Sequence, residues 1–192
     1  MREGKAMTSK ANDEGARRMN PWRAAAWSFA GLILLLPLVA MQFTAEVNWT
    51  AGDFIFAALT IGTVGLVIEL AARTSRSVPY RAGVGFAVAA SFLIVWVNGA
   101  VGMIGDEDNP YNLLFLGVIP LALLGAVLAR FRAPGMAWAT ALAGLAQAAI
   151  AIGGIPADLR GGVLSAGLAC LWLLSAALFH NAGRGPSETG TA

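Results

Sequence analysis

The chain has 192 residues, of which 57% are hydrophobic and only 12% are charged. A soluble domain carries about 25% charged residues, so this composition excludes an ordinary water-soluble globular protein. The net charge of +2 does not indicate nucleic-acid binding, because the basic residues flank long apolar runs, where membrane topology and anionic lipid headgroups account for them. We expect no nucleic-acid partner.

Six apolar runs of helical length follow one another along the chain. A membrane-spanning helix needs about 20 apolar residues, whereas the strands of a membrane barrel alternate over about ten. The predicted fold is therefore all-α, a six-helix transmembrane bundle. Its domain is expected to cover 22–181, between disordered cytoplasmic tails at 1–21 and 182–192. The expected helices are 24–41, 54–72, 82–105, 113–131, 136–155 and 162–179.

The first run follows a basic tail, as the apolar segment of a signal peptide does. Its 18 residues are longer than the 7–15 of a typical signal peptide, and no small-x-small cleavage pattern follows it. We therefore expect an uncleaved helix. Pro37 lies in its last turns and Pro120 lies near the middle of the fourth helix, and each removes a backbone hydrogen bond. Asn109 and Pro110 are typical of a helix start.

The distribution of basic residues predicts the topology. Lys and Arg resist translocation and remain on the cytoplasmic side of a membrane. The six runs divide the chain into seven polar segments, and the even-numbered segments hold only Arg160. We therefore expect both termini in the cytoplasm. The odd-numbered segments hold Arg2, Lys5, Lys10, Arg17, Arg18, Arg23, Arg73, Arg76, Arg81, Arg130, Arg132 and Arg184.

The charges within the spans are Glu69 and Arg130, both near the cytoplasmic side. Glu69 and Arg73 are four residues apart, so they can pair on one helix face. We interpret them as an interfacial ion pair that anchors the second helix. An ion or proton site is the alternative, although proton relays normally place ionisable groups near mid-membrane.

The candidate intramembrane polar site consists of Asn98, Gln147, Thr60 and Thr63, which lie at similar depths on three helices. An amide avoids lipid, so Asn98 is expected to face the bundle interior and to bond across to the second or fifth helix. A small-molecule site is the alternative. Gly99, Gly102 and Gly105 are spaced by three, which favours close packing on one face of the third helix.

Other polar residues give weaker signals. The acidic cluster 106–108 is expected to be a solvated external loop, because adjacent carboxylates rarely converge on one cation. His180 complements a helix C-terminus. Cys170, the single cysteine, is expected to be buried and excludes an intramolecular disulfide. We find no catalytic set, no cofactor motif and no metal-ligand spacing, so no catalytic, cofactor-binding or metal residue is predicted.

Five segments carry a resemblance to known proteins: Glu69–Arg73, Tyr80–Gly85, Val95–Gly102, Asp108–Pro110 and Ala129–Met136. They resemble segments of a family of small multi-pass bacterial inner-membrane proteins with no assigned activity. The resemblance covers between a third and half of the chain, within 45–161. It implies a bacterial inner (plasma) membrane location and no substrate, cofactor or catalytic residue.

These observations favour a non-enzymatic membrane bundle that packs with itself or with other membrane proteins, besides the lipid bilayer. The glycine faces, the short loops and the absence of reactive groups motivate this hypothesis. The alternative is a small-solute transporter or channel, which the prolines and the buried amides would suit. A membrane-embedded enzyme is the third class, and it would need ionisable groups that meet at one depth.

Overall fold

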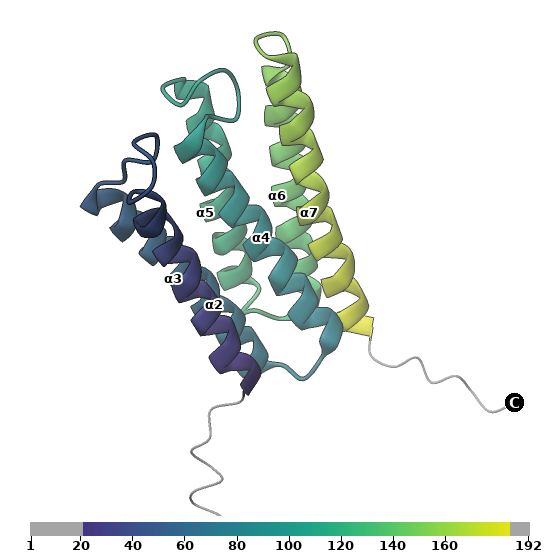
Figure 1. Ribbon diagram of the computed structural model, residues 1–192. Helices are drawn as coiled ribbons and strands as arrows, with labels where there is room; N and C mark the ends of the chain where they lie inside the picture. The colour runs from purple at the N-terminus through teal and green to yellow at the C-terminus, as the bar shows by residue number, and fades with distance from the viewer. Residues whose placement is uncertain (1–20, 185–192) are drawn as a thin grey trace, which may run out of the picture. The chain divides into compact units, whose positions relative to one another are not determined.

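The computed structural model describes residues 21–184, and in this range the fold is all-α, without strands (Figure 1). Six helices in this range are long and apolar enough to cross a membrane, as predicted. The chain is therefore a polytopic membrane protein by length and composition of its helices. It forms two compact units, one ending at Gly65 and the other beginning at Leu66, inside the second spanning helix.

The first unit contains α2 (Pro21–Ala40), the loop 41–50 and most of α3 (Ala51–Thr74). The Trp27 ring packs against the backbone of Gly65, where an added Cβ would lie 2.7 Å from the ring atom Cη2. At the start of α3, the Asp53 carboxylate accepts hydrogen bonds from the Thr50 backbone N–H at 2.7 Å and hydroxyl at 2.8 Å. The Asp53 N–H donates back to Thr50 Oγ1, which completes a capping box.

The second unit holds the end of α3 and four further long helices. Among these, α6 packs along α7, α7 also packs against α4, and α5 packs against α6. The core between them includes Phe115, Val118 and Trp172, each at most 1% exposed. The bounds are α4 (Val78–Ala100), η1 (Pro110–Asn112), α5 (Leu113–Leu128), α6 (Ala133–Gly154) and α7 (Leu159–Arg184).

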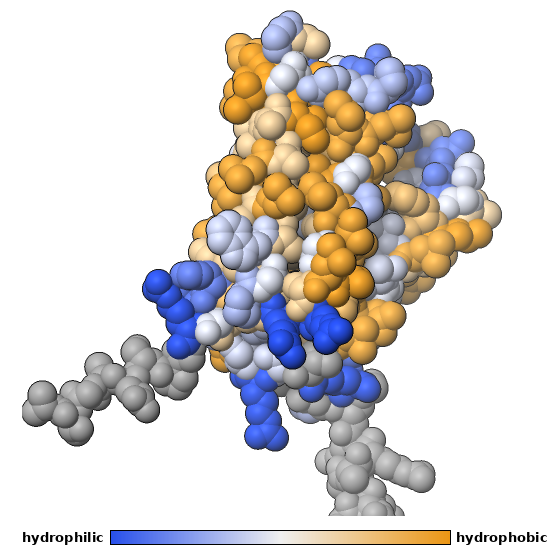
Figure 2. All heavy atoms as spheres, turned by 180° about the vertical axis from the view of Figure 1, so that it is seen from behind, coloured by the Kyte–Doolittle hydropathy of each residue, from blue (hydrophilic) through white to orange (hydrophobic). Residues whose placement is uncertain are grey.

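The exterior of the helices is apolar, as a lipid-facing surface requires. On the face shown in Figure 2, hydrophobic residues cover the sides of the helices and hydrophilic residues gather at their ends. In α5, for example, Leu123, Leu124 and Leu128 are each more than half exposed. Since water would penalise this surface by roughly 25 cal/mol per Å² of apolar area, the sides of these helices are suited to a bilayer.

One departure from the predicted bounds is at the end of α4. The apolar run 82–105 was predicted to be one helix, but α4 ends at Ala100. Gly102 and Gly105 have φ of 79° and 74°, which a continuing helix does not allow. The following loop is apolar because Met103 and Ile104 fold inward and are 4% and 1% exposed. The prediction that Gly102 and Gly105 form a helix face is therefore wrong.

Other helix ends also differ from the predicted bounds. Asn109 does act as a cap, with its side chain accepting from the Tyr111 N–H, but the turn that it starts is the 3₁₀ turn η1. After α5, Arg130 and Phe131 adopt φ of 50° and 57°, which turns the chain toward α6. α7 continues to Arg184, so the predicted tail at 182–192 begins too early. The remaining tail residues and most of the tail at 1–21 lie outside the described range.

Candidate functional site

Gln147 lies in the centre of the second unit and is completely buried. Its Oε1 accepts a hydrogen bond from Trp172 Nε1 at 2.8 Å, and its Nε2 donates to the Ser165 carbonyl at 3.2 Å. Both partners are on α7. A buried amide needs such partners, because leaving one unpaired costs about 1–3 kcal/mol. The predicted interhelical hydrogen bonding of Gln147 is present, and both the oxygen and the nitrogen of its amide bond to α7.

Asn98 is different. Its Nδ2 donates to the Ile94 carbonyl of its own helix at 2.7 Å. Its Oδ1 is buried and accepts no hydrogen bond from the part of the chain that the structure describes. The predicted bond from Asn98 across to the fifth helix is therefore wrong, because Gln147 is engaged by α7 instead. This oxygen has two lone pairs and can accept hydrogen bonds from up to two donors.

The two threonines of the predicted site belong to the first unit. Thr60 donates its hydroxyl to the Phe56 carbonyl at 2.8 Å, a bond within its own helix. Thr63 is exposed. Hydroxyls that bond back to the preceding turn satisfy themselves without a neighbouring helix. Asn98 and Gln147 belong to the second unit.

The predicted ion pair is confirmed. Arg73 Nε lies 2.8 Å from Glu69 Oε1, four residues apart on α3. The Arg73 side chain is 64% exposed and that of Glu69 is 14% exposed. An exposed pair of this kind contributes at most about 1 kcal/mol in water, so its position at the end of a span matters more than its strength.

The prediction missed two serines on α7 that bond to other segments. Ser175 is fully buried and donates to the Gly83 carbonyl of α4 at 2.7 Å. Ser165 donates to the Met103 carbonyl at 3.4 Å. Together with Trp172, these side chains lie at spacings of seven and three residues, which places them on one face of α7. That spacing was visible in the sequence and could have indicated the contact face.

A second missed group fastens the loop 101–109. Asn112 is 4% exposed, and its Oδ1 accepts from the backbone N–H groups of Met103 at 3.1 Å and Ile104 at 2.8 Å. Its Nδ2 donates to the Asp106 carbonyl at 2.7 Å. The Asn112 side chain thus forms hydrogen bonds with three backbone groups of a loop that lies outside the regular helices.

Asp158, in the connection between α6 and α7, also bonds to the loop 101–109. Its carboxylate accepts from the Gly161 N–H at 2.9 Å and from the Gly105 N–H at 3.0 Å. These two backbone hydrogen bonds hold the pKa of Asp158 below its ordinary value, and the Arg160 backbone N–H and charge lower the pKa further. The loops 101–109 and 155–158 therefore lie together at one end of the second unit.

The remaining predicted positions do not assemble a reactive site. Residues 106–108 are exposed, as expected for a solvated loop, and His180 is exposed at the end of α7. Cys170 is exposed on the side of α7, so the prediction of a buried cysteine is wrong. Across 21–184, no three His, Cys, Asp or Glu side chains are grouped closely enough to hold a metal ion.

The comparisons with known proteins give no relative. No family model, no curated protein and no solved structure matches this chain.

Proposed function

We propose that this chain is a non-enzymatic membrane bundle that packs with copies of itself or with other membrane proteins. The observation that supports this most directly is the state of the buried Gln147 side chain. Gln147 is 0% exposed and both of its functional groups are bonded to α7. An amide that binds a solute must be reachable, and Gln147 is not, because its side chain is fully buried against α7.

The experiment that tests this proposal is native mass spectrometry of the full chain released from membrane vesicles. We expect ions that contain two or more copies, or one copy with a second membrane protein. The competing outcome is a monomer that carries lipid alone. That result, together with solute-dependent swelling of liposomes that contain the purified chain, would replace the packing role with transport.

Solute transport is the second candidate, and one observation favours it. The buried Asn98 Oδ1 has capacity for a donor from a ligand or a water. The Asn98→Leu variant separates the two roles. If the bundle only packs, removing an unpaired oxygen should leave the melting temperature in detergent unchanged or raise it. If Asn98 binds a solute, the variant should abolish liposome swelling without lowering the melting temperature.

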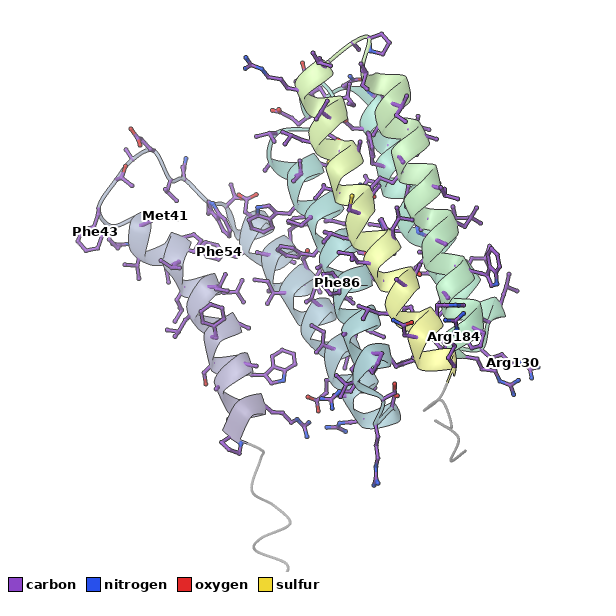
Figure 3. The ribbon with its side chains drawn as sticks, turned by 90° about the vertical axis from the view of Figure 1, so that its right-hand side faces the viewer. Met41, Phe43, Phe54, Phe86, Arg130 and Arg184 are labelled. Carbon is purple, nitrogen blue, oxygen red and sulfur yellow. The ribbon has the colours of Figure 1, made fainter. Side chains whose placement is uncertain are left out.

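We further propose that both termini are cytoplasmic and that the membrane is a bacterial inner membrane, on the basis of the basic-residue distribution and the resemblance given above. Within the second unit, Arg130 and Arg184 lie at the same end (Figure 3). The loop pair joined by the bond between Asp158 and Gly105 contains the acidic cluster 106–108.

Reporter fusions test the orientation. A periplasm-active reporter at residue 108 should be active, and the same reporter at the C-terminus should be inactive. A cytoplasm-active reporter serves as the matched control and should give the opposite pattern. Equal activity of one reporter at both positions would contradict the proposed topology.

A further inference from the structure

A cavity of 310 Å³ lies where α3 ends and α4 begins, within the second unit. This volume is at the lower end of the range of ligand pockets, about 300–1,000 Å³. Its lining contains five apolar residues and one cation. These residues are Ile68, Ala71, Ala72, Val78, Arg81 and Ala82.

The walls are set by the link between the two helices, residues 75–77 (Figure 1). The Ser77 N–H donates to Ser75 Oγ at 3.2 Å, and Ser77 Oγ caps α4 by accepting from the Tyr80 N–H at 3.4 Å. The Tyr80 hydroxyl in turn donates to the Phe131 carbonyl at 2.8 Å. The start of α4, which supplies half of the lining, is therefore fastened to the α5–α6 turn.

The mouth of the cavity is positively charged. Arg81 is exposed in the first turn of α4, and Arg76 is exposed in the link. Within 21–184 neither side chain makes an ion pair, whereas the nearby Arg73 is paired with Glu69. A cation in the first turn of a helix adds to the positive end of the helix dipole, so the fold gains nothing from Arg81 there. The charge is suited to an anion from outside the chain.

We propose that this cavity binds one anionic phospholipid, with an acyl chain against the apolar wall and the phosphate on the Arg81 guanidinium. The ligand must be both apolar and anionic, because the wall is apolar and the exposed arginines lie at the end of the spanning helices. Arg suits phosphate because its planar group donates two parallel hydrogen bonds. The small side chains of Ala72 and Ala82 leave the room that the chain would occupy. This site goes beyond the packing role and does not depend on it.

The test uses the full chain in a neutral detergent, with binding of phosphatidylglycerol and phosphatidylcholine followed by native mass spectrometry. We expect retained phosphatidylglycerol and no retained phosphatidylcholine at the same concentration. Arg81→Gln should weaken phosphatidylglycerol binding about fivefold, the factor that corresponds to about 1 kcal/mol for one basic residue at a membrane surface. Ala82→Trp, which fills the cavity and keeps the charge, should weaken binding at least as much.

Arg132→Gln is the matched control, because Arg132 is also exposed and basic but lies outside the cavity lining. It should leave binding unchanged, and both arginine variants should melt within about 2 °C of the parent in lipid-free detergent, since a surface substitution has little effect on stability. Equal weakening by Arg81→Gln and Arg132→Gln would overturn the site in favour of diffuse attraction. Full competition by inorganic phosphate or glycerol phosphate would overturn it in favour of an anion site without an acyl chain. An Ala82→Trp variant that binds phosphatidylglycerol as the parent does would also overturn it.

Discussion

The helices α2 and α6 are both apolar and of similar length, but they are packed very differently. In the 18-residue apolar window of each helix, none of α2 is buried within the structure, whereas 44% of the α6 window is. The difference follows from the side chains that α6 places on one face, where Ala143, Gly144 and Ala151 allow α7 to approach and Gln147 bonds to it. Hydropathy makes both segments spanning helices, and small residues with one satisfied amide make α6 a core helix.

The loops of the two units differ in how far along the sequence their side-chain hydrogen bonds reach. In and around the loop 41–50, the side chains of Gln42, Thr44 and Asp53 form hydrogen bonds only to residues at most four positions away. In the second unit, Asp158 and Ser165 bond to backbone groups 53 and 62 residues away. Bonds between distant segments tie a hairpin to the bundle, whereas local bonds shape only the turn itself. We therefore expect substitutions in the second unit to have larger effects on global stability.

The largest effect is expected for Gln147→Leu. The substitution leaves the buried Trp172 N–H without an acceptor, and an unpaired buried group costs about 1–3 kcal/mol. Thr60→Val is the control in the first unit, because it removes only a bond within one helix, and it should change stability by less than about 0.5 kcal/mol. Both are measured by unfolding in mixed detergent. Equal effects of the two substitutions would remove the distinction between the units.

Glycine substitutions should differ in sign between the units. A Cβ at Gly162 would lie 3.0 Å from the Ala151 carbonyl oxygen and 2.7 Å from Ile155 Cγ1, so Gly162→Ala should destabilise by about 1–2 kcal/mol. A Cβ at Gly62 would meet nothing within 4 Å. Gly62→Ala should therefore stabilise by about 0.5–1 kcal/mol through the higher helix propensity of alanine. The measurement is the melting temperature of each variant in detergent. A higher melting temperature for Gly162→Ala would contradict the close packing of Gly162 against Ala151 and Ile155.

The smallest effect is expected from the pH dependence of the fastened loop. Because the pKa of Asp158 is lowered by its hydrogen bonds to Gly161 and Gly105, its contribution to stability is complete above the ordinary pKa of 3.8. It is lost as the pH falls through the lowered native pKa. Hydrogen exchange at the Gly105 amide should therefore show less protection in acid. Asp158→Asn should remove most of this pH dependence, and Glu107→Gln, in the exposed cluster, should not. An unchanged profile in Asp158→Asn would contradict the role of the carboxylate.

Part of the candidate site was predictable, because it depends on spacing along one helix. The pairing of Glu69 with Arg73 follows from four-residue separation, and the structure confirms it. The partner of Gln147 did not follow, because equal depth in a membrane does not identify the helix that packs alongside. Asn98 lies at similar depth, but α7 supplies both partners of Gln147. Matching depths therefore predicted burial correctly for Gln147 and bonding wrongly for Asn98.

The sequence by itself determined that residues 21–184 hold six helices of membrane-spanning length, because apolar runs near 20 residues have no other stable form in lipid. It also determined the ion pair on α3. Only the tertiary structure decided that the apolar residues Met103 and Ile104 belong to an inward-folded loop, because their burial depends on Asn112 and on neighbours from other helices. Hydropathy records how strongly a residue avoids water, and packing decides whether lipid or protein replaces that water.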